Sequence, residues 1–439
     1  MKYTKLFFTG ILIFAIQALV NAQSAQNFKL KHKWEDISLT GSWQYNNTYN
    51  EVWGVVNEGR EYAIIGSTYG THFIDVTDSI SFKEVGRVKG GTSGRAVVHR
   101  DYHDYKGHIY AVCDEGRNST LQIIDFTSLP DSVSVVYDSD VLIEKSHNIF
   151  IDSSSARMYV CERYGLRIFS LDDPVKPKLL ATYTEDGVHD LYVRNDTAYL
   201  SCGINMRIVD FTDFKNPNTL LILRDYQEKG YNHNGWLNEN GNTFLFTDET
   251  KGMRVKVCSV SDLSNFDIVS MIQPKYSDSS MAHNVVIKGD VAYIAYYNDG
   301  VQVYDISNST APERIGYYNS GNYDTSSPFL GVWGVYPFLP SGKILISNMQ
   351  KGLSVLEHSQ GYILGSEEIS SYISKIEVYP NPATDYLVVD LEAFNGKEVT
   401  IQLINQLGNS VQAVQIDEVT NRTERIDLTN AANGSYVVY

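Results

Sequence analysis

The feature that most constrains this 439-residue chain is a pair of residues that recurs at a nearly constant interval. Five dipeptides of His followed by Asn or Asp recur, and two Trp-Gly dipeptides hold the same phase at either end: Trp53-Gly54, His103-Asp104, His147-Asn148, His189-Asp190, His233-Asn234, His283-Asn284 and Trp333-Gly334. The steps between them are 50, 44, 42, 44, 50 and 50 residues. This interval is the length of one four-stranded propeller blade. The sequence therefore predicts an all-β fold with a seven-bladed β-propeller over residues 23–360.

Each repeat unit shows the same order of four short apolar strands separated by polar turns. The third strand ends in an acid just before a Thr or Ser turn in four units, at Asp75, Asp125, Asp210 and Asp305. Short acidic side chains at such positions accept hydrogen bonds from exposed backbone N–H groups. We therefore interpret this Asp as a turn residue and not as a catalytic acid, and its replacement by Ser170 and Ser259 in two units agrees with that role.

The last unit shows only three clear strands, at 332–338, 343–349 and 353–358. An unfilled position in that blade would leave an exposed strand edge, which natural sheets avoid. We therefore expect the N-terminal segment 28–35 to supply the missing strand and close the ring.

The N-terminus has the order of a secretion signal. Lys2 and Lys5 precede an apolar stretch over residues 6–20, and Val20-Asn21-Ala22 resembles a cleavage site. Residues 1–22 are therefore predicted to be a signal peptide, and no later segment approaches a transmembrane run. Their removal takes away two Lys and no acid, so the formal net charge moves from −16 to −18. This charge argues against nucleic acid and anionic membranes as partners, because both need Lys/Arg patches.

The four cysteines, Cys113, Cys161, Cys202 and Cys258, are few for a fold built on disulfides, and no Cys-x-x-Cys motif occurs. Three of them hold similar places in successive units. We expect buried free thiols.

A second module follows a Ser/Gly/Glu-rich stretch over 361–374, which is typical of a linker. The segment Tyr379-Pro380-Asn381-Pro382 precedes a series of alternating strands. Two prolines around Asn381 fix an extended turn, so residues 375–439 are predicted to form a small β-sandwich.

The repeat unit resembles a known family. Third strands followed by an Asp-x-Thr/Ser turn resemble the LVIVD repeat. The order of blocks over residues 45–358, such as Glu51-Val52-Trp53-Gly54 and His233-Asn234-Gly235-Trp236-Leu237, resembles the extracellular "choice-of-anchor B" family. The resemblance implies a surface-exposed propeller and no established reaction. The Trp-Arg-Asp of that family is absent from the second unit, where His103-Asp104 stands.

The C-terminal module resembles the type A sorting domain of the type IX secretion system of Bacteroidota, through Tyr379-Pro380-Asn381-Pro382 and the turn Asn405-Gln406-Leu407-Gly408. The resemblance implies the type IX machinery as a partner and export through the periplasm to the cell surface or the medium. Such domains continue with a further strand and a basic tail after the point that corresponds to Tyr439. The resemblance therefore implies either a truncated sequence or impaired sorting.

The propeller geometry gathers the recurring dipeptides at one end of the channel. The start of the first strand and the end of the second lie on the same face of a blade, so acids that follow second strands should surround the histidines. They are Asp114, Glu115, Glu162, Asp248, Glu249 and Asp299. The candidate metal ligands in this set are His147, His189, His233, His283, Asp248 and Glu249. Imidazole with carboxylate suits zinc, nickel or manganese, and carboxylate with amide oxygens suits calcium. Alternatively, each recurring pair only hydrogen-bonds its blade to the next.

The chain has no Gly-x-Ser-x-Gly, His-Glu-x-x-His or phosphate-binding loop, so no catalytic residue is assigned. The leading hypothesis is a binding propeller that presents its channel face, including the seven recurring dipeptides, to an extracellular protein, glycan or small ligand. Two alternatives stay open. One is a metal-dependent hydrolase or lyase with its site at the His-lined channel, and the other is a structural envelope protein.

Overall fold

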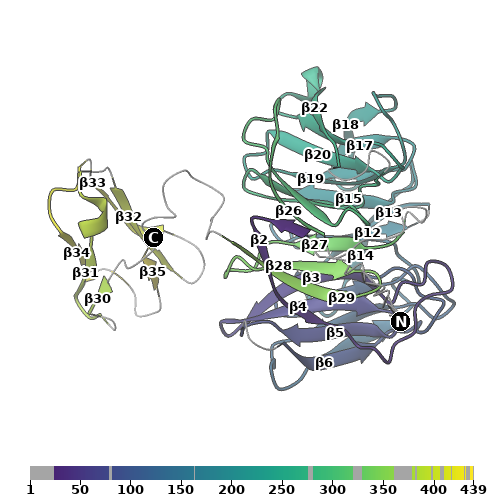
Figure 1. Ribbon diagram of the computed structural model, residues 1–439, viewed down its shortest axis with the longest axis horizontal. Helices are drawn as coiled ribbons and strands as arrows, with labels where there is room; N and C mark the ends of the chain where they lie inside the picture. The colour runs from purple at the N-terminus through teal and green to yellow at the C-terminus, as the bar shows by residue number, and fades with distance from the viewer. Residues whose placement is uncertain are drawn as a thin grey trace, which may run out of the picture. The chain divides into compact units, whose positions relative to one another are not determined.

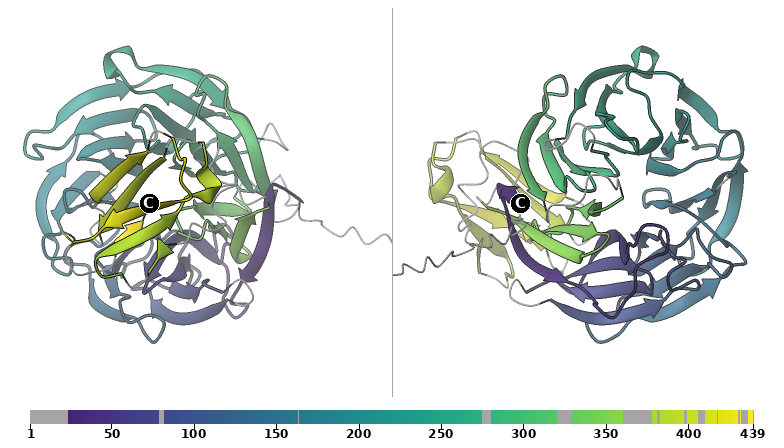
Figure 2. Two further views of the ribbon diagram at one scale, coloured as in Figure 1. Left: turned by 90° about the vertical axis from the view of Figure 1, so that its left-hand side faces the viewer. Right: turned by 45° about the vertical axis from the view of Figure 1, so that its right-hand side comes forward.

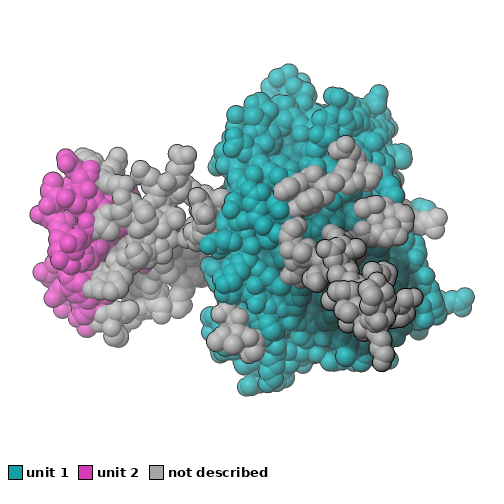
Figure 3. Space-filling model, viewed as in Figure 1, with its two compact units in different colours: residues 1–360 teal, residues 361–439 magenta. Residues whose placement is uncertain are grey.

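The computed structural model describes residues 24–78, 82–162, 164–274, 280–319, 329–359, 378–380, 383–396, 399–405, 410–416, 418–429, 431 and 436–438. The predicted signal peptide, the linker and two residues of the sorting signature, Asn381 and Pro382, lie outside this set. The chain divides into two compact units, residues 1–360 and 361–439 (Figure 3).

The described residues of the first unit form seven antiparallel sheets, six of four strands and one of five, and include no α-helix (Figure 1). The first three blades are β3 (Tyr49–Asn57), β4 (Arg60–Ser67), β5 (Gly70–Asp75) and β6 (Lys83–Lys89); β7 (Asp101–Tyr105), β8 (His108–Val112), β9 (Leu121–Asp125) and β10 (Ser134–Ser139); and β11 (Ile149–Asp152), β12 (Arg157–Glu162), β13 (Gly165–Ser170) and β14 (Lys178–Tyr183).

The next two blades are β15 (Asp190–Arg194), β16 (Thr197–Ser201), β17 (Met206–Asp210) and β18 (Asn218–Leu223), and β19 (Asn232–Leu237), β20 (Thr243–Asp248), β21 (Val255–Ser259) and β22 (Asp267–Ile272). Blade six holds β23 (Val285–Lys288), β24 (Val291–Ala295), β25 (Val301–Asp305) and β26 (Glu313–Asn319), and blade seven holds β27 (Val332–Tyr336), β28 (Ile344–Asn348) and β29 (Gly352–His358).

The sheets form a closed ring. The innermost strand of each blade contacts the innermost strand of the next, in the order β3, β7, β11, β15, β19, β23, β27 and back to β3. Figure 2 shows this circular arrangement of the strands. The predicted all-β propeller fold is confirmed, and the described residues of this unit form seven blades.

The N-terminal segment closes the ring, as the incomplete last unit predicts. Strand β2 (Phe28–Trp34) pairs antiparallel with β29 and becomes the outer strand of blade seven. A shorter strand, β1 (Ser24–Gln26), pairs with β26 and adds a fifth strand to blade six. The sequence analysis did not predict this second contact. Together the two strands join the first described residues of the chain to its last two blades.

Apolar side chains of adjacent blades pack against each other and form the core. Tyr110 and Leu121 of blade two pack with Ile149 and Met158 of blade three, for example, and all four are almost fully buried. The turn interpretation of the recurring acid is also confirmed. The backbone N–H of Thr77 donates to Asp75 Oδ1 at 3.0 Å, and the same bond recurs in three other blades, at Thr127, Thr212 and Ser307. The four cysteines are free thiols, as predicted.

The second unit contains two small sheets that face a common apolar core. One sheet is β30 (Val378–Tyr379), β31 (Tyr386–Asp390) and β34 (Thr423–Asp427), and the other is β33 (Ser410–Ile416), β32 (Val399–Asn405) and β35 (Tyr436–Val438). Leu387, Ile401, Leu403 and Ile426 are buried between them. This is the small β domain that the sequence predicts. Across the described residues of the chain, we find no helix with the length and apolarity to cross a membrane.

The closing strand generates a stability prediction. Trp34 of β2 packs against the rings of Tyr49 and His72 in blade one, at centroid distances of 6.0 and 5.1 Å. Because this half-buried side chain fastens β2 to the neighbouring blade, we expect Trp34→Ala to lower the free energy of unfolding by about 2 kcal/mol, measured by urea denaturation. Trp43→Ala is the matched control, since Trp43 is 72% exposed. Equal stability of the two variants would contradict this role of β2.

Candidate functional site: three layers along the channel

Side chains of the seven innermost strands, and of the residues just before or after these strands, form three successive layers along the channel. The first is a histidine layer, made of His99, His147, His189, His233, His283 and Trp333. The second is a polar layer, made of Glu51, Asp101, Asn148, Asp190, Asn234 and Asn284. The third is an aromatic layer, made of Trp53, His103, Phe150, Tyr192, Trp236, Tyr336 and Phe338. Residues of the first two layers line one recess together, and residues of the second and third line another.

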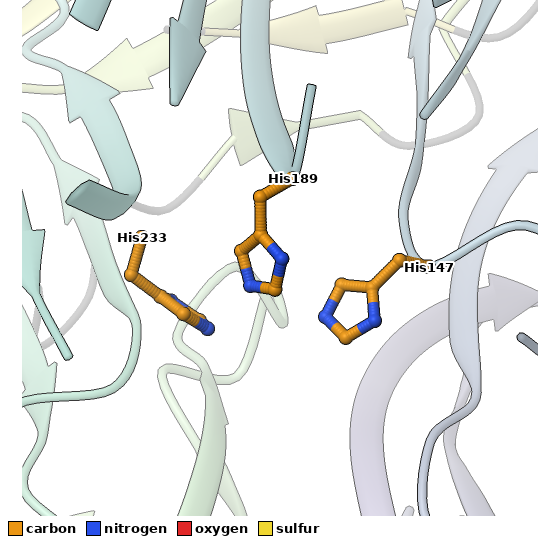
Figure 4. Close-up of side chains that lie close together, drawn as sticks. All are labelled: His147, His189 and His233. Atoms are coloured by element: carbon orange, nitrogen blue, oxygen red, sulfur yellow. The ribbon is translucent and has the colours of Figure 1, made fainter. Parts of the chain in front are cut away.

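The histidine layer is a closed circle of six rings. Neighbouring ring centroids are 4.7, 4.1, 4.5, 4.4, 4.4 and 5.2 Å apart, from His99 through His147, His189, His233, His283 and Trp333 back to His99. Figure 4 shows three of these imidazoles side by side, each reaching in from a different blade. The predicted convergence of His147, His189, His233 and His283 is therefore present in the structure.

The phase assigned to blade two was wrong. His103 and Asp104 lie inside β7, paired with Tyr110 and Ile109, rather than at its start. The equivalent pair is Arg100-Asp101. Asp101 Oδ2 accepts a hydrogen bond from Ile149 N of the next blade at 2.8 Å, as Asn234 Oδ1 does from Val285 N at 2.9 Å.

The phase of blade one was wrong by the same three residues. Trp53 and Gly54 pair with Ile64 and Ala63 inside β3, and Asn50-Glu51 holds the place of the recurring pair. Trp53 and His103 therefore belong to the aromatic layer. Of the two tryptophans in Trp-Gly dipeptides, only Trp333 lies in the histidine layer. Asp104 accepts a hydrogen bond from Trp53 Nε1 at 2.9 Å and is likewise outside the histidine layer.

Hydrogen bonds orient two of the imidazoles. His147 Nδ1 lies 2.7 Å from Asp114 Oδ2, and His283 Nδ1 lies 2.7 Å from the Trp333 carbonyl oxygen. Because a carbonyl or carboxylate oxygen only accepts, each Nδ1 carries a proton, which leaves Nε2 as the nitrogen that could bind a metal. Such partners fix the tautomer of metal-binding histidines in proteins. His189 Nε2 and His233 Nδ1 are buried with no hydrogen-bond partner.

The layer is divided into a neutral part and a charged part. Burial lowers the pKa of His189 and His233 well below the ordinary value, and it lowers the pKa of His283 to about 3. These rings are therefore neutral at pH 7. His99 differs. Burial alone would lower its pKa, but hydrogen bonds and charges from Asp114 and Glu115 raise it to about 10.

Three groups in the layer could hold a metal ion, because their ligand atoms lie within 4.8 Å of one another. They are His147, His189 and His233; His99, Asp114 and His147; and His233, Glu249 and His283. In the second group, His99 and Asp114 already form an ion pair at 3.4 Å. The first group consists of imidazoles alone, which are ligands of zinc, copper and nickel rather than of calcium.

Only some of the acids that were predicted to surround the histidines face this layer. Asp114, Glu115 and Glu249 do, and Glu249 Oε2 lies 3.7 Å from His233 Nε2. Asp248 does not, which corrects its prediction as a metal ligand. It is fully buried, 2.5 Å from Lys256 Nζ, and it accepts a hydrogen bond from Tyr226 Oη at 2.7 Å. The reason is strand alternation, which points consecutive side chains to opposite faces. Glu162 pairs with Arg167 of its own blade.

The polar layer links the blades to one another. Asp190 accepts hydrogen bonds from Asn148 Nδ2 and Asn234 Nδ2 at 3.2 and 3.1 Å, and Asn284 Nδ2 donates to Glu51 Oε2 at 3.0 Å. Burial raises the pKa of Glu51 to about 8, that of Asp101 to about 7 and that of Asp190 above its ordinary value. The recurring Asn and Asp therefore serve the blade-to-blade role that the sequence analysis kept as an alternative.

Gly334 explains why blade seven departs from the repeat. A Cβ at this position would lie 1.9 Å from Glu51 Oε1, so a side chain and this carboxylate cannot share the space. Blade seven thus has a glycine where blades two to six have Asn or Asp, and Glu51 from blade one occupies the space of the missing side chain.

Two functional features were missed from the sequence. His99 is separated from Asp101 by one residue, so it falls outside a search for His-Asp dipeptides. The aromatic layer has a clear signal, since Trp53, His103, Phe150, Tyr192, Trp236 and Tyr336 each stand three residues after the first residue of the corrected pair. The offset becomes regular only when blades one and two are in the corrected phase, which the dipeptides alone do not give.

A cavity of about 570 Å³ adjoins the histidine layer. Its lining includes Asp114, His147, His189, Cys202 and Tyr231. Two of the three imidazoles of the all-histidine group therefore border a space large enough for a small ligand.

Comparison with known proteins identifies parts of both units. The family model for the LVIVD repeat matches residues 279–320, which cover blade six, and the model for the secretion system C-terminal sorting domain matches residues 377–439. No curated protein matches the chain.

The correction at Asp248 generates a prediction. Asp248→Asn leaves the buried Lys256 ammonium without its counter-charge, so we expect a loss of about 3 kcal/mol in the free energy of unfolding by urea denaturation. The double variant Asp248→Leu with Lys256→Met removes both charges and should recover most of that loss. A stable single variant would show that the ion pair is not structural.

Proposed function

We propose that this chain is an extracellular binding protein that holds a transition-metal ion in its histidine layer. The chain carries an LVIVD repeat in its propeller and a type IX secretion sorting domain, which directs it to the cell surface and exterior. The observation that carries the proposal is the group His147, His189 and His233, whose ligand atoms lie within 4.8 Å of one another. His189, which is partly buried, and His233, which is buried, have lowered pKa values and are neutral at pH 7, the form that binds metals.

The chemistry of the group favours zinc, copper or nickel. Three protein nitrogens leave a coordination position for a further donor atom, as in sites that keep one place for water or a ligand. The adjoining cavity is bordered by His147 and His189. A carboxylate, hydroxyl or imidazole of an extracellular ligand that entered this cavity would be the further donor.

A metal-dependent hydrolase or lyase is the second candidate. Three protein ligands with an open position also describe catalytic zinc sites. Glu249 supplies a carboxyl beside His233, and burial raises its pKa. This is a candidate general acid or base. Turnover of ester, amide or glycoside substrates that is lost on metal removal would favour this candidate over a binding role.

Metal binding is expected to appear in the fluorescence of Trp333, whose ring centroid lies 4.4 Å from that of His283. Adding Ni²⁺ or Co²⁺ to the metal-free protein should quench this fluorescence, and Trp333→Phe should remove the signal. We expect His189→Ala to weaken the metal affinity by about a hundredfold, because it removes a ligand from the centre of the group.

His108→Ala is the matched control, because His108 lies outside the histidine layer and its Nδ1 bonds the Lys106 carbonyl at 2.8 Å. Elemental analysis of the purified protein gives the stoichiometry. Absence of any bound transition metal, with equal quenching in the His189 and His108 variants, would refute the proposed site.

Export is expected to depend on the second unit. Cells that produce residues 1–360 alone should retain the propeller in the periplasm, because the sorting domain that the type IX machinery recognises is missing. Protease accessibility on intact cells, compared with the full chain, measures this. Equal surface exposure of the two forms would show that the second unit is dispensable for sorting.

A further inference from the structure

We propose a second binding site at the aromatic layer, separate from the histidine layer, that takes a neutral sugar ring. The two layers lie three residues apart along the innermost strands, which is about 10 Å at the rise of a β-strand. The polar layer lies between them. This proposal adds a ligand class to the metal site and does not depend on it.

The aromatic layer is a closed circle of rings. Neighbouring centroids are 4.6, 4.9, 5.3, 4.8, 5.9, 5.3 and 5.0 Å apart, from Trp53 through His103, Phe150, Tyr192, Trp236, Phe338 and Tyr336 back to Trp53. Blade six contributes Val286 at this level instead of a ring. Phe338 of blade seven lies nearly parallel to Trp236, with 28° between the planes, and completes the circle.

The rings border a cavity of about 330 Å³, which is within the size range of small-ligand pockets. Five of them, Trp53, Phe150, Trp236, Tyr336 and Phe338, are only partly buried. The apolar residues between the blades are almost fully buried in contrast. The aromatic layer therefore presents ring surface to the cavity that core packing does not use.

The polar groups at the same cavity select the class of ligand. Asp152, Arg194 and Asn195 line it beside the rings. Aromatic cages often bind cations, but the positive charge of Arg194 would repel a cation here. The negative charge of Asp152 would repel an anion. A wholly apolar ligand would displace water from these polar groups and offer no hydrogen bond in return, which costs free energy. A sugar ring has an apolar C–H face for the aromatic rings and hydroxyls at its edge for the polar groups, so it fits both parts of the lining.

Two of the five tryptophans lie in this layer, so binding can be followed by intrinsic fluorescence. The full chain is titrated with methyl glycosides and short oligosaccharides of the common hexoses and N-acetylhexosamines, and each hit is confirmed by calorimetry. We expect at least one neutral glycoside to bind and to shift the tryptophan emission. Trp236→Ala should weaken that binding about tenfold or more, and His189→Ala should leave it unchanged.

Trp43→Ala is the matched control, since Trp43 is exposed and outside the channel. Arg194→Ala gives a second variant that removes no ring from the circle. Its side chain donates to Tyr192 Oη at 3.0 Å and to the Glu239 carbonyl at 3.0 Å, and we expect it to weaken binding less than Trp236→Ala does. Thermal melting of each variant checks that it is folded.

The proposal is overturned if no neutral glycoside binds, if the Trp43 variant loses as much affinity as the Trp236 variant, or if only apolar peptides or tetraalkylammonium ions bind the layer. The metal site is tested with a different ligand and different variants, so the failure of either proposal leaves the other intact.

Discussion

The pairing of β2 with β29 is the interaction on which the rest of the structure depends. A propeller blade buries its faces only against neighbouring blades, so seven blades in a row would leave two faces and one strand edge exposed. By supplying the outer strand of the last blade from the start of the chain, the N-terminal segment makes the ring covalently continuous at its seam. Residues more than 200 positions apart, such as Glu51 and Asn284, become hydrogen-bonded neighbours only because of that closure.

Closure also sets the chemistry of the channel. Seven innermost strands of similar phase place equivalent residues at the same depth, so each type of residue becomes a layer. A repeated polar residue at the axis must find partners in adjacent blades, and Asp190 does so by accepting from both Asn148 and Asn234. His189 and His233 each keep a buried nitrogen without a partner in the same environment. The structural and the functional interpretations of the repeat therefore apply to different layers, and they do not compete for the same residues.

The sequence was sufficient for the fold and for much of the histidine layer, because both follow from period. Spacing alone placed His147, His189, His233 and His283 in one circle. It failed where a blade departs from the consensus. His103 was aligned by its dipeptide, yet in the structure it lies within β7 and pairs with Tyr110. The position of Glu51 could not be predicted for a different reason, since it depends on the space left by Gly334, a residue of the last blade. The prediction of Asp248 as a metal ligand was wrong by one position, because the side chains of adjacent residues in a strand point to opposite faces.

The polar layer has a consequence for the two ends of the channel. Burial shifts the pKa of Glu51 to about 8 and that of Asp101 to about 7, so these acids are largely or partly protonated near neutral pH. Three ionised carboxylates at that depth would attract protons and cations to the histidine layer and would disfavour the neutral imidazoles that a metal needs. As protonated carboxyls and neutral amides, the groups of the polar layer hydrogen-bond the blades to one another without placing full charge on the axis. The histidine layer can then keep neutral rings on one side, and the aromatic layer can accept a neutral ligand on the other, in a protein whose overall charge is strongly negative.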